Sequence, residues 1–298
     1  MSLNSKADNY DYLIERRLKS IDPALHERYR NSVFAIDHLL ANYKNIFPFF
    51  TNHTFEHSAQ VIRYCNIIAG NEIVDALNAD ELYILLLGAA LHDIGMGVSE
   101  ADFAAFAPEI PTLKKALEEK PGLSVAEYTR QFHQELSARF IIKYHRLFEI
   151  PSESHLFCIT QIARGHRKLD LLDESEFPSA YRLENGSTVN LAYLTALVKL
   201  ADELDIASDR NLMFDYSVQN KQWSPTQTLC YKCHNAIKRF AAEDERLVLY
   251  FYAADRTVRD EVMLTAAKVE RTFASYNAVM RQRTSFPSRL QSVIFEEI

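Results

Sequence analysis

The sequence predicts a mainly α-helical protein that ends in a small α+β module. Its 298 residues include only seven glycines and nine prolines, too few for the many tight turns of a barrel or sandwich. Apolar residues recur at helical spacing through the first two thirds of the chain. From about residue 210, β-branched and aromatic residues cluster instead, which favours strands. We therefore expect a helical domain over 1–210 and a small module, 211–298, packed on it.

Apolar stripes and capping residues place the helices of the first domain. The expected helices cover 9–20, 24–45, a segment that starts near His53 or Thr54, one capped by Asn78 or Asp80, one capped by Ser99, and then 124–147, 152–167 and 191–206. Residues 112–123 are short, charged and interrupted by Pro121 and Gly122, so they read as a surface excursion that could cover the site. The acidic segment 168–190 reads as a loop.

The C-terminal module is expected to alternate strands with helices. Strands are predicted at 211–218, 247–253 and 292–297, with helical patterns at 226–241 and 256–283. The chain ends on a predicted strand, which suggests a piece of a longer protein, although a compact protein can also end in this way.

A polar doublet interrupts the most apolar helix of the chain. Residues 82–91 are almost entirely apolar and strongly helix-forming, and His92-Asp93 follows them directly, just before Gly95 and Gly97. A buried imidazole and a buried carboxylate each need a partner, and a metal ion suits both. The glycines end the helix, so both side chains can turn toward one centre. The sequence therefore predicts a metal site at the end of a core helix.

Further histidines and an aspartate extend this pattern, and with them the chain resembles the HD superfamily of metal-dependent phosphohydrolases. The resemblance covers about residues 50–210. It is carried by Glu56-His57-Ser58, Leu91-His92-Asp93-Ile94-Gly95 and Lys199-Leu200-Ala201-Asp202. It implies an HD-type helical bundle. The chain is most similar to HD domains that lie N-terminal to Hsp90-like ATPase modules in some bacterial proteins, which implies an Hsp90-like ATPase partner domain if this chain is a fragment.

His133 and His166 extend the resemblance to the binuclear subgroup. There, His57, His92 and Asp202 would hold one ion, His133 and His166 the other, and Asp93 would bridge them. Asp93 and His92 would be the catalytic residues. The implied cofactor is one or two divalent transition metal ions, Fe, Mn, Zn, Ni or Co, with Mg possible. The cyclic-dinucleotide branch has two adjacent histidines and a Gly-Tyr-Pro motif where this chain has Gly165-His166-Arg167-Lys168, and a single-metal site stays open.

Cations and carboxylates near these ligands have both functional and ordinary interpretations. Arg164, Arg167 and Lys199 could bind a substrate phosphate or form a solvated face, and Arg164 is favoured because it lies on the same helical turn as His166. His53 could face the substrate or begin a helix. Glu203 and Asp205 could orient ligand imidazoles or lie at a solvated helix end. We expect His145 at the surface.

The motif Cys230-Tyr231-Lys232-Cys233-His234 matches the spacing of c-type haem attachment. No export signal accompanies it, and no second CxxC completes a zinc cage. Leu229, Cys233, Ile237 and Phe240 follow an amphipathic helical pattern, so we interpret the motif as packing.

The expected function is hydrolysis of a phosphoester, in a nucleotide or related small phosphate, by a metal-activated hydroxide. Three alternatives remain: a metal-dependent nuclease, a catalytically weak HD sensor or interaction module that regulates a partner domain, and a di-iron oxygenase. The net charge of −7 provides no general attraction for nucleic acid, so nucleic acid is possible but not favoured.

Composition also bounds the location and the assembly. No run reaches the roughly 18 apolar residues of a membrane span, and the N-terminus has no apolar signal region, so we expect a cytoplasmic protein without a membrane partner. Four cysteines are too few for a disulfide framework. A homodimer is the expectation from base rates alone.

Overall fold

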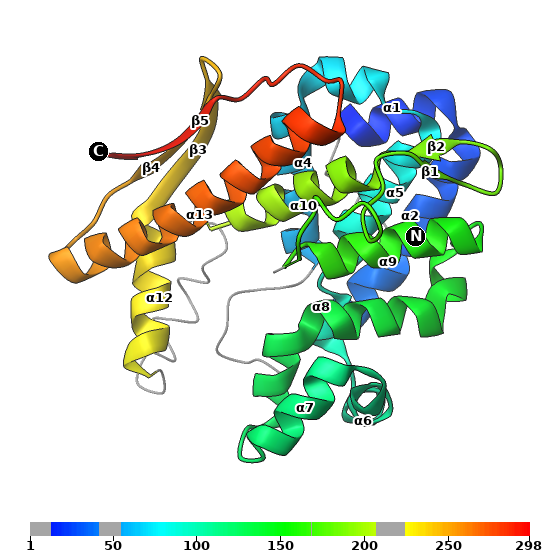
Figure 1. Cartoon of the computed structure of the whole chain (residues 1–298). Helices are drawn as coiled ribbons and strands as arrows, with labels where there is room; N and C mark the ends of the chain where they lie inside the picture. Colours follow the sequence, from blue (N-terminus) through cyan, green and yellow to red (C-terminus); the bar gives the residue numbers. More distant parts are fainter. Residues whose placement is uncertain (1–12, 42–54, 168, 207–223) are drawn as a thin grey trace, which may run out of the picture.

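The computed structural model describes residues 13–41, 55–167, 169–206 and 224–298. In this part of the chain the prediction of a mainly α-helical protein with a small C-terminal α+β module is confirmed (Figure 1). The helices are α1 (Leu13–Ile21), α2 (Pro23–Leu40), α4 (Phe55–Ala76), α5 (Ala79–Leu91), α6 (Glu100–Phe106), α7 (Pro111–Glu119), α8 (Val125–Tyr144), α9 (Glu153–Gly165), α10 (Leu191–Leu204), α12 (Pro225–Ala236) and α13 (Arg256–Arg283). The strands are β1 (Tyr181–Arg182), β2 (Thr188–Val189), β3 (Ile237–Glu243), β4 (Arg246–Phe251) and β5 (Ser292–Glu297).

Helix α5 is the centre of the bundle. Its residues from Asp80 to Leu91 are all buried, because α1, α2, α4, α9 and α10 pack around it. The helix begins with a capping box, in which the side chain of Asn78 accepts the Glu81 backbone N–H and Glu81 accepts that of Asn78. Asn78 is thus the cap, and Asp80 bonds to the His155 ring instead, at 2.7 Å.

The C-terminal module is a three-stranded sheet with two helices. The strand order is β3-β4-β5, with β3 antiparallel and β5 parallel to β4. Helix α13 packs against α10 of the bundle, and Figure 1 shows the two helices running alongside each other. The predicted domain boundary near 210 and the predicted strand 211–218 lie outside the described residues, so the division into two domains stays a prediction.

Three sequence predictions need correction. The helix expected over 226–241 ends at Ala236, and Ile237–Glu243 is strand β3. The backbone of this segment hydrogen-bonds to β4, and this tertiary pairing overrides the local amphipathic pattern. The expected surface excursion 112–123 contains helix α7, anchored by the fully buried Leu113. The expected loop 168–190 contains the β1–β2 hairpin.

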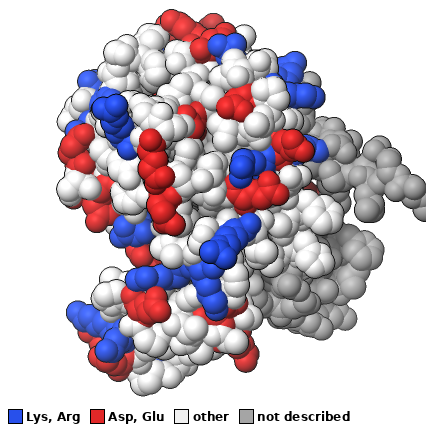
Figure 2. Space-filling view, turned by 90° about the vertical axis from the view of Figure 1, so that its right-hand side faces the viewer, with Lys and Arg blue, Asp and Glu red and all other residues white. Residues whose placement is uncertain are grey.

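The surface carries charges of both signs. On the face shown in Figure 2, acidic and basic side chains are interspersed, and neither sign forms a continuous track. Among the described residues no single helix is both long and apolar enough to span a membrane; by length and composition only, the bent pair Ala79–Gly97 and Glu100–Glu109 meets that test together, with 102° between its halves.

Candidate metal centre

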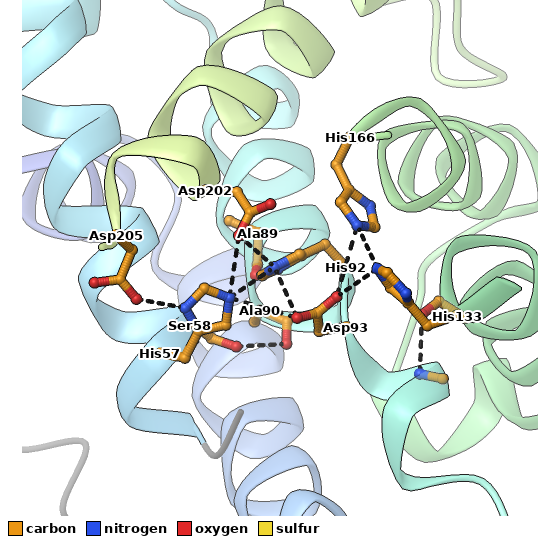
Figure 3. A network of polar contacts seen from close by, with 12 residues as sticks. His57, Ser58, Ala89, Ala90, His92, Asp93, His133, His166, Asp202 and Asp205 are labelled. Carbon is orange, nitrogen blue, oxygen red and sulfur yellow. Dashed lines mark hydrogen bonds and ion pairs between the residues drawn. The ribbon is translucent and has the colours of Figure 1, made fainter. Parts of the chain in front are cut away.

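Six side chains from five parts of the bundle converge at the C-terminal end of α5 (Figure 3). All are buried except Asp202, whose side chain is 19% exposed. They are His57 on α4, His92 and Asp93 directly after α5, His133 on α8, His166 at the end of α9, and Asp202 on α10. The structure thus brings together all six residues that the sequence predicted as ligands.

The backbone after α5 turns the two neighbouring side chains toward the same centre. His92 still has helical dihedral angles, whereas Asp93 has φ −105° and ψ 9°, and a short 3₁₀ helix, Ile94–Gly97, follows. A β-carbon at Gly95 would lie 2.4 Å from the His133 carbonyl oxygen and from the Ser137 backbone nitrogen. The absent side chain therefore allows this turn to press directly against α8, where Gly95 N–H donates to Ser137 Oγ at 2.9 Å.

The converging atoms form two triads. In the first triad, His57, His92 and Asp202, the two Nε2 atoms are 3.1 Å apart, and Asp202 Oδ1 lies 3.2 Å from His57 Nε2 and 3.6 Å from His92 Nε2. In the second triad, Asp93, His133 and His166, the two Nε2 atoms are again 3.1 Å apart. Each triad has the donor set of a transition-metal site.

Asp93 lies between the triads. Its Oδ1 atom is 3.3 Å from His133 Nε2 and 3.6 Å from His166 Nε2. Its Oδ2 atom is 3.5 Å from His57 Nε2 and 3.6 Å from His92 Nε2. One carboxylate oxygen thus faces each pair of histidines, which is the position of a bridging ligand. The ligand roles themselves stay predictions.

The hydrogen bond at Nδ1 of each histidine ring determines which ring nitrogen carries the proton. His92, His133 and His166 each place Nδ1 2.6–2.8 Å from the backbone carbonyl three residues earlier, and His57 places Nδ1 2.6 Å from Asp205 Oδ2. These oxygens accept only, so Nδ1 donates and the neutral ring has its lone pair on Nε2. All four Nε2 lone pairs therefore point into the centre.

This arrangement fits divalent cations. Two neutral rings cannot hydrogen-bond through facing lone pairs, but both can bind one cation. The Nε2 atoms of each histidine pair are 3.1 Å apart, near enough for both to bind one cation at ordinary metal–nitrogen distances of about 2.1 Å. The residues present thus fit the predicted one or two metal ions.

Burial and mutual charge set the protonation of the centre. Burial lowers the pKa of His133, and burial with the neighbouring His92 and His133 lowers that of His166 well below its usual value. At His92, burial lowers the pKa, but Asp93 and Asp202 outweigh it, so that the pKa is raised. Burial raises the pKa of Asp202, yet the neighbouring His57 and His92 rings hold it well below its usual value. The first triad thus contains an ionised carboxylate, Asp202, and the second triad contains the neutral rings of His133 and His166. Both states suit cation binding, because metal ligands must be deprotonated.

The two acidic residues after Asp202 have different roles. Asp205 is fully buried and orients His57, as one of the two interpretations of the sequence expected. Glu203 instead pairs with Lys268 on α13, at 2.7 Å. Ser137, which accepts the Gly95 N–H, was not identified from the sequence, and no motif marks it.

The predicted substrate residues are placed unequally. Arg164 pairs with Glu135 at 3.3 Å and with Glu176 at 3.1 Å, so acidic side chains already engage it. Lys199 donates to the Leu169 carbonyl at 3.4 Å. Arg167 is half-buried, and its charge acts on both His133 and Lys199. His53 lies outside the described residues.

The remaining candidates lie apart from the converging side chains. In the CxxCH motif on α12, Cys233 is buried beside Thr265 of α13, with Sγ 3.7 Å from Oγ1, and Cys230 is exposed. The packing interpretation thus holds for Cys233. All four cysteines are free. His145 bonds through Nδ1 to the Ile142 carbonyl at 2.9 Å and belongs to neither triad.

Comparison with known proteins identifies a family. A family model described as HD-CE matches residues 47–279, which is more than half of the chain and includes all six converging residues. No curated protein and no solved structure matches the chain.

Proposed function

The chain belongs to the HD-CE family, and on that premise we propose that it is a metal-dependent phosphohydrolase. The proposed substrate is a phosphoester in a nucleotide or a related small phosphate. One observation supports this most: four histidine Nε2 atoms and two carboxylates converge as two triads with Asp93 between them. We propose one ion per triad, with Fe, Mn, Zn, Ni or Co favoured by the imidazole-rich donor set and Mg possible.

Bound divalent ions would supply Lewis acidity and lower the pKa of a water at the centre. The chain's own residues would hold the ligand side chains in the orientation that binding requires. His57 is held in one orientation by Asp205, and the other three rings are held by carbonyls of their own helices. Because these contacts are already made, the donor atoms need little rearrangement to bind an ion.

The exposed part of Asp202 suggests where substrate would approach. Asp202 is 19% exposed, whereas the side chains of Asp93 and the four histidines are at most 8% exposed. Arg167 adds positive charge near His133, and Lys199 lies close enough to Arg167 for their charges to interact. Both could attract a phosphate. Of the three predicted substrate cations we therefore favour Arg167 and Lys199 over the already paired Arg164.

The test combines metal analysis with a substrate panel. Purified protein should contain close to two transition-metal ions per chain, and Asp93→Ala should lose both metal and activity, because it removes the shared carboxylate. His145→Ala is the matched control, since that ring belongs to neither triad. Metal at trace levels in the wild-type protein would refute the metal centre.

The same preparations should be assayed against mononucleotides, cyclic nucleotides, dinucleotides and short oligonucleotides, with Asp93→Ala as the blank. Release of phosphate from mononucleotides supports the proposal. Cleavage of oligonucleotides alone would make the protein a nuclease, and metal binding without turnover of any compound would indicate a sensor.

A further inference from the structure

A groove lies between helix α13 and strand β5, away from the residues of the metal centre. Its volume is about 350 Å³, and α13 packs against β5 beside it. The residues that line it are Glu270, Phe273, Ala274, Asn277 and Arg281 of α13, with Gln291, Ser292 and Val293 at the start of β5. The α13 residues recur every three to four positions, so they form one stripe along the helix.

The two edges of the sheet differ in chemistry. Strand β3 forms one edge, and it has a bulge between Ile237 and Arg239 and the charged side chains of Lys238 and Arg239, all of which discourage another strand from pairing. Strand β5 forms the other edge among the described strands. It reads Ser-Val-Ile-Phe before its two glutamates, and its pairing with β4 has no bulge. Only the β5 edge has the features of a strand that accepts a partner.

The backbone of β5 offers hydrogen-bonding groups along this edge. At the C-terminal end of β5, Ile298 donates its N–H to the Phe251 carbonyl of β4. Because backbone groups alternate along a strand, the N–H groups of Val293 and Phe295 point away from β4. In the groove itself, Asn277 Oδ1 is buried without a hydrogen-bond partner in the described part of the chain. An added backbone could supply the missing donor.

The two ends of the groove carry opposite charges, which determine the charge pattern of a peptide that could bind there. Arg281 and Glu270 are exposed and line the groove. Arg259, near the start of α13, pairs with Glu297 at the end of β5, so α13 and β5 run in opposite directions and Arg281 lies near the start of β5. Eleven residue steps along α13 separate Glu270 from Arg281, about 16 Å. The end Cα atoms of an extended pentapeptide are about 13 Å apart, and the long charged side chains cover the difference.

We propose that this groove binds an extended peptide of a partner protein, which adds to β5 as a further strand. The peptide would carry an acidic residue at the Arg281 end, a basic residue at the Glu270 end four positions away, and an apolar residue midway between them on the same face, against Phe273 and Val293. Strand addition of this kind uses main-chain hydrogen bonds for affinity and alternate side chains for specificity. Antiparallel pairing is the more stable arrangement, so the acidic residue is at the C-terminal end of the peptide.

The test uses fluorescein-labelled pentapeptides and the full chain, with binding followed by fluorescence anisotropy. The first peptide is Lys-Thr-Val-Thr-Glu, in which Lys, Val and Glu share one face of the strand. The second has the two charged residues exchanged, and the third has proline in place of the central valine. The wild-type protein should bind the first about five- to tenfold more tightly than the second, since exchange converts two exposed ion pairs into repulsions. The proline peptide should bind at least tenfold more weakly, because proline cannot extend a sheet in the middle of a strand.

Charge exchange on the protein makes the test specific to the groove. The double variant Glu270→Lys with Arg281→Glu should reverse the preference between the first two peptides. Arg271→Glu is the matched control, because Arg271 is also exposed on α13 but does not line the groove, and it should retain the wild-type preference. An unchanged preference in the double variant, equal binding of the proline peptide, or no binding of any peptide would overturn the proposal. A concentration-dependent dimer that the first peptide dissociates would overturn it also, because the occupant would then be a second copy.

Discussion

Replacement of Asp205 by asparagine should weaken metal binding at the first triad alone. Asp205 Oδ2 accepts the His57 Nδ1 proton at 2.6 Å, and both residues are buried. Asparagine retains a carbonyl oxygen of the same shape, so the hydrogen bond can persist while the charge is lost. A hydrogen bond to a charged group contributes about 1.5–3 kcal/mol and a neutral one about 0.5–1.5 kcal/mol. The difference of about 1–1.5 kcal/mol corresponds to a five- to tenfold weaker affinity.

Competition between the metal-free protein and a chelating dye measures this change. Two binding steps are expected, and only the step of the first triad should weaken in Asp205→Asn, because His133 and His166 are oriented by backbone carbonyls. Glu203→Gln is the matched control: Glu203 is acidic and on the same helix end, but pairs with Lys268 rather than with a ligand. Equal losses in the two variants, or an unaltered first step in Asp205→Asn, would refute the reasoning.

Three further predictions concern stability. Gly95→Ala should lower the free energy of unfolding by about 1–3 kcal/mol through overpacking against α8, whereas Gly97→Ala, whose added carbon would meet only the Leu39 carbonyl at 3.5 Å, should change it by less than about 1 kcal/mol; equal effects in urea unfolding would contradict the close packing at Gly95. Asp80→Asn should destabilise the protein near pH 7 but not at low pH: the hydrogen bond with His155 lowers the pKa of Asp80, so its contribution exists above the unfolded pKa and disappears as the pH falls through the folded one. A difference between the variant and the wild-type protein that stays constant as the pH falls from 7 would exclude this linkage. Chelation should lower the melting temperature of the wild-type protein, because a metal at a hundred times its dissociation constant adds about 3 kcal/mol to the free energy of unfolding. The melting temperature of Asp93→Ala should not change. A wild-type protein insensitive to chelation would argue against a bound metal.

The helical part and the converging side chains could be predicted because their signals are local. His92-Asp93 stands out since it follows a run of apolar residues, and each further ligand lies in a short segment of its own helix. The apolar period alone identified α13 at its observed ends, Arg256–Arg283. Local patterns suffice where burial on one face determines the element.

The features that the sequence could not predict depend on contacts between distant segments. Ile237 and Phe240 continue the helical spacing of α12 but belong to β3, where Phe240 packs edge-on against Tyr64 of α4 with ring centres 5.0 Å apart. Glu203 and Asp205 are two residues apart, and both side chains are carboxylates. Only the end of α10 decides that Asp205 turns inward to His57 while Glu203 faces α13.

The spacing of the ligands along the chain implies an order in which the two halves of the centre can form during synthesis. His133 and His166 are 33 residues apart, whereas His57 and its buried partner Asp205 are 148 residues apart. Closing the longer loop costs about 1 kcal/mol more in chain entropy. The first triad also lacks Asp202 until α10 has left the ribosome, when α4, α5, α8 and α9 are already available. The second triad is therefore the half that a growing chain can assemble first, and the first triad closes only when the bundle is complete.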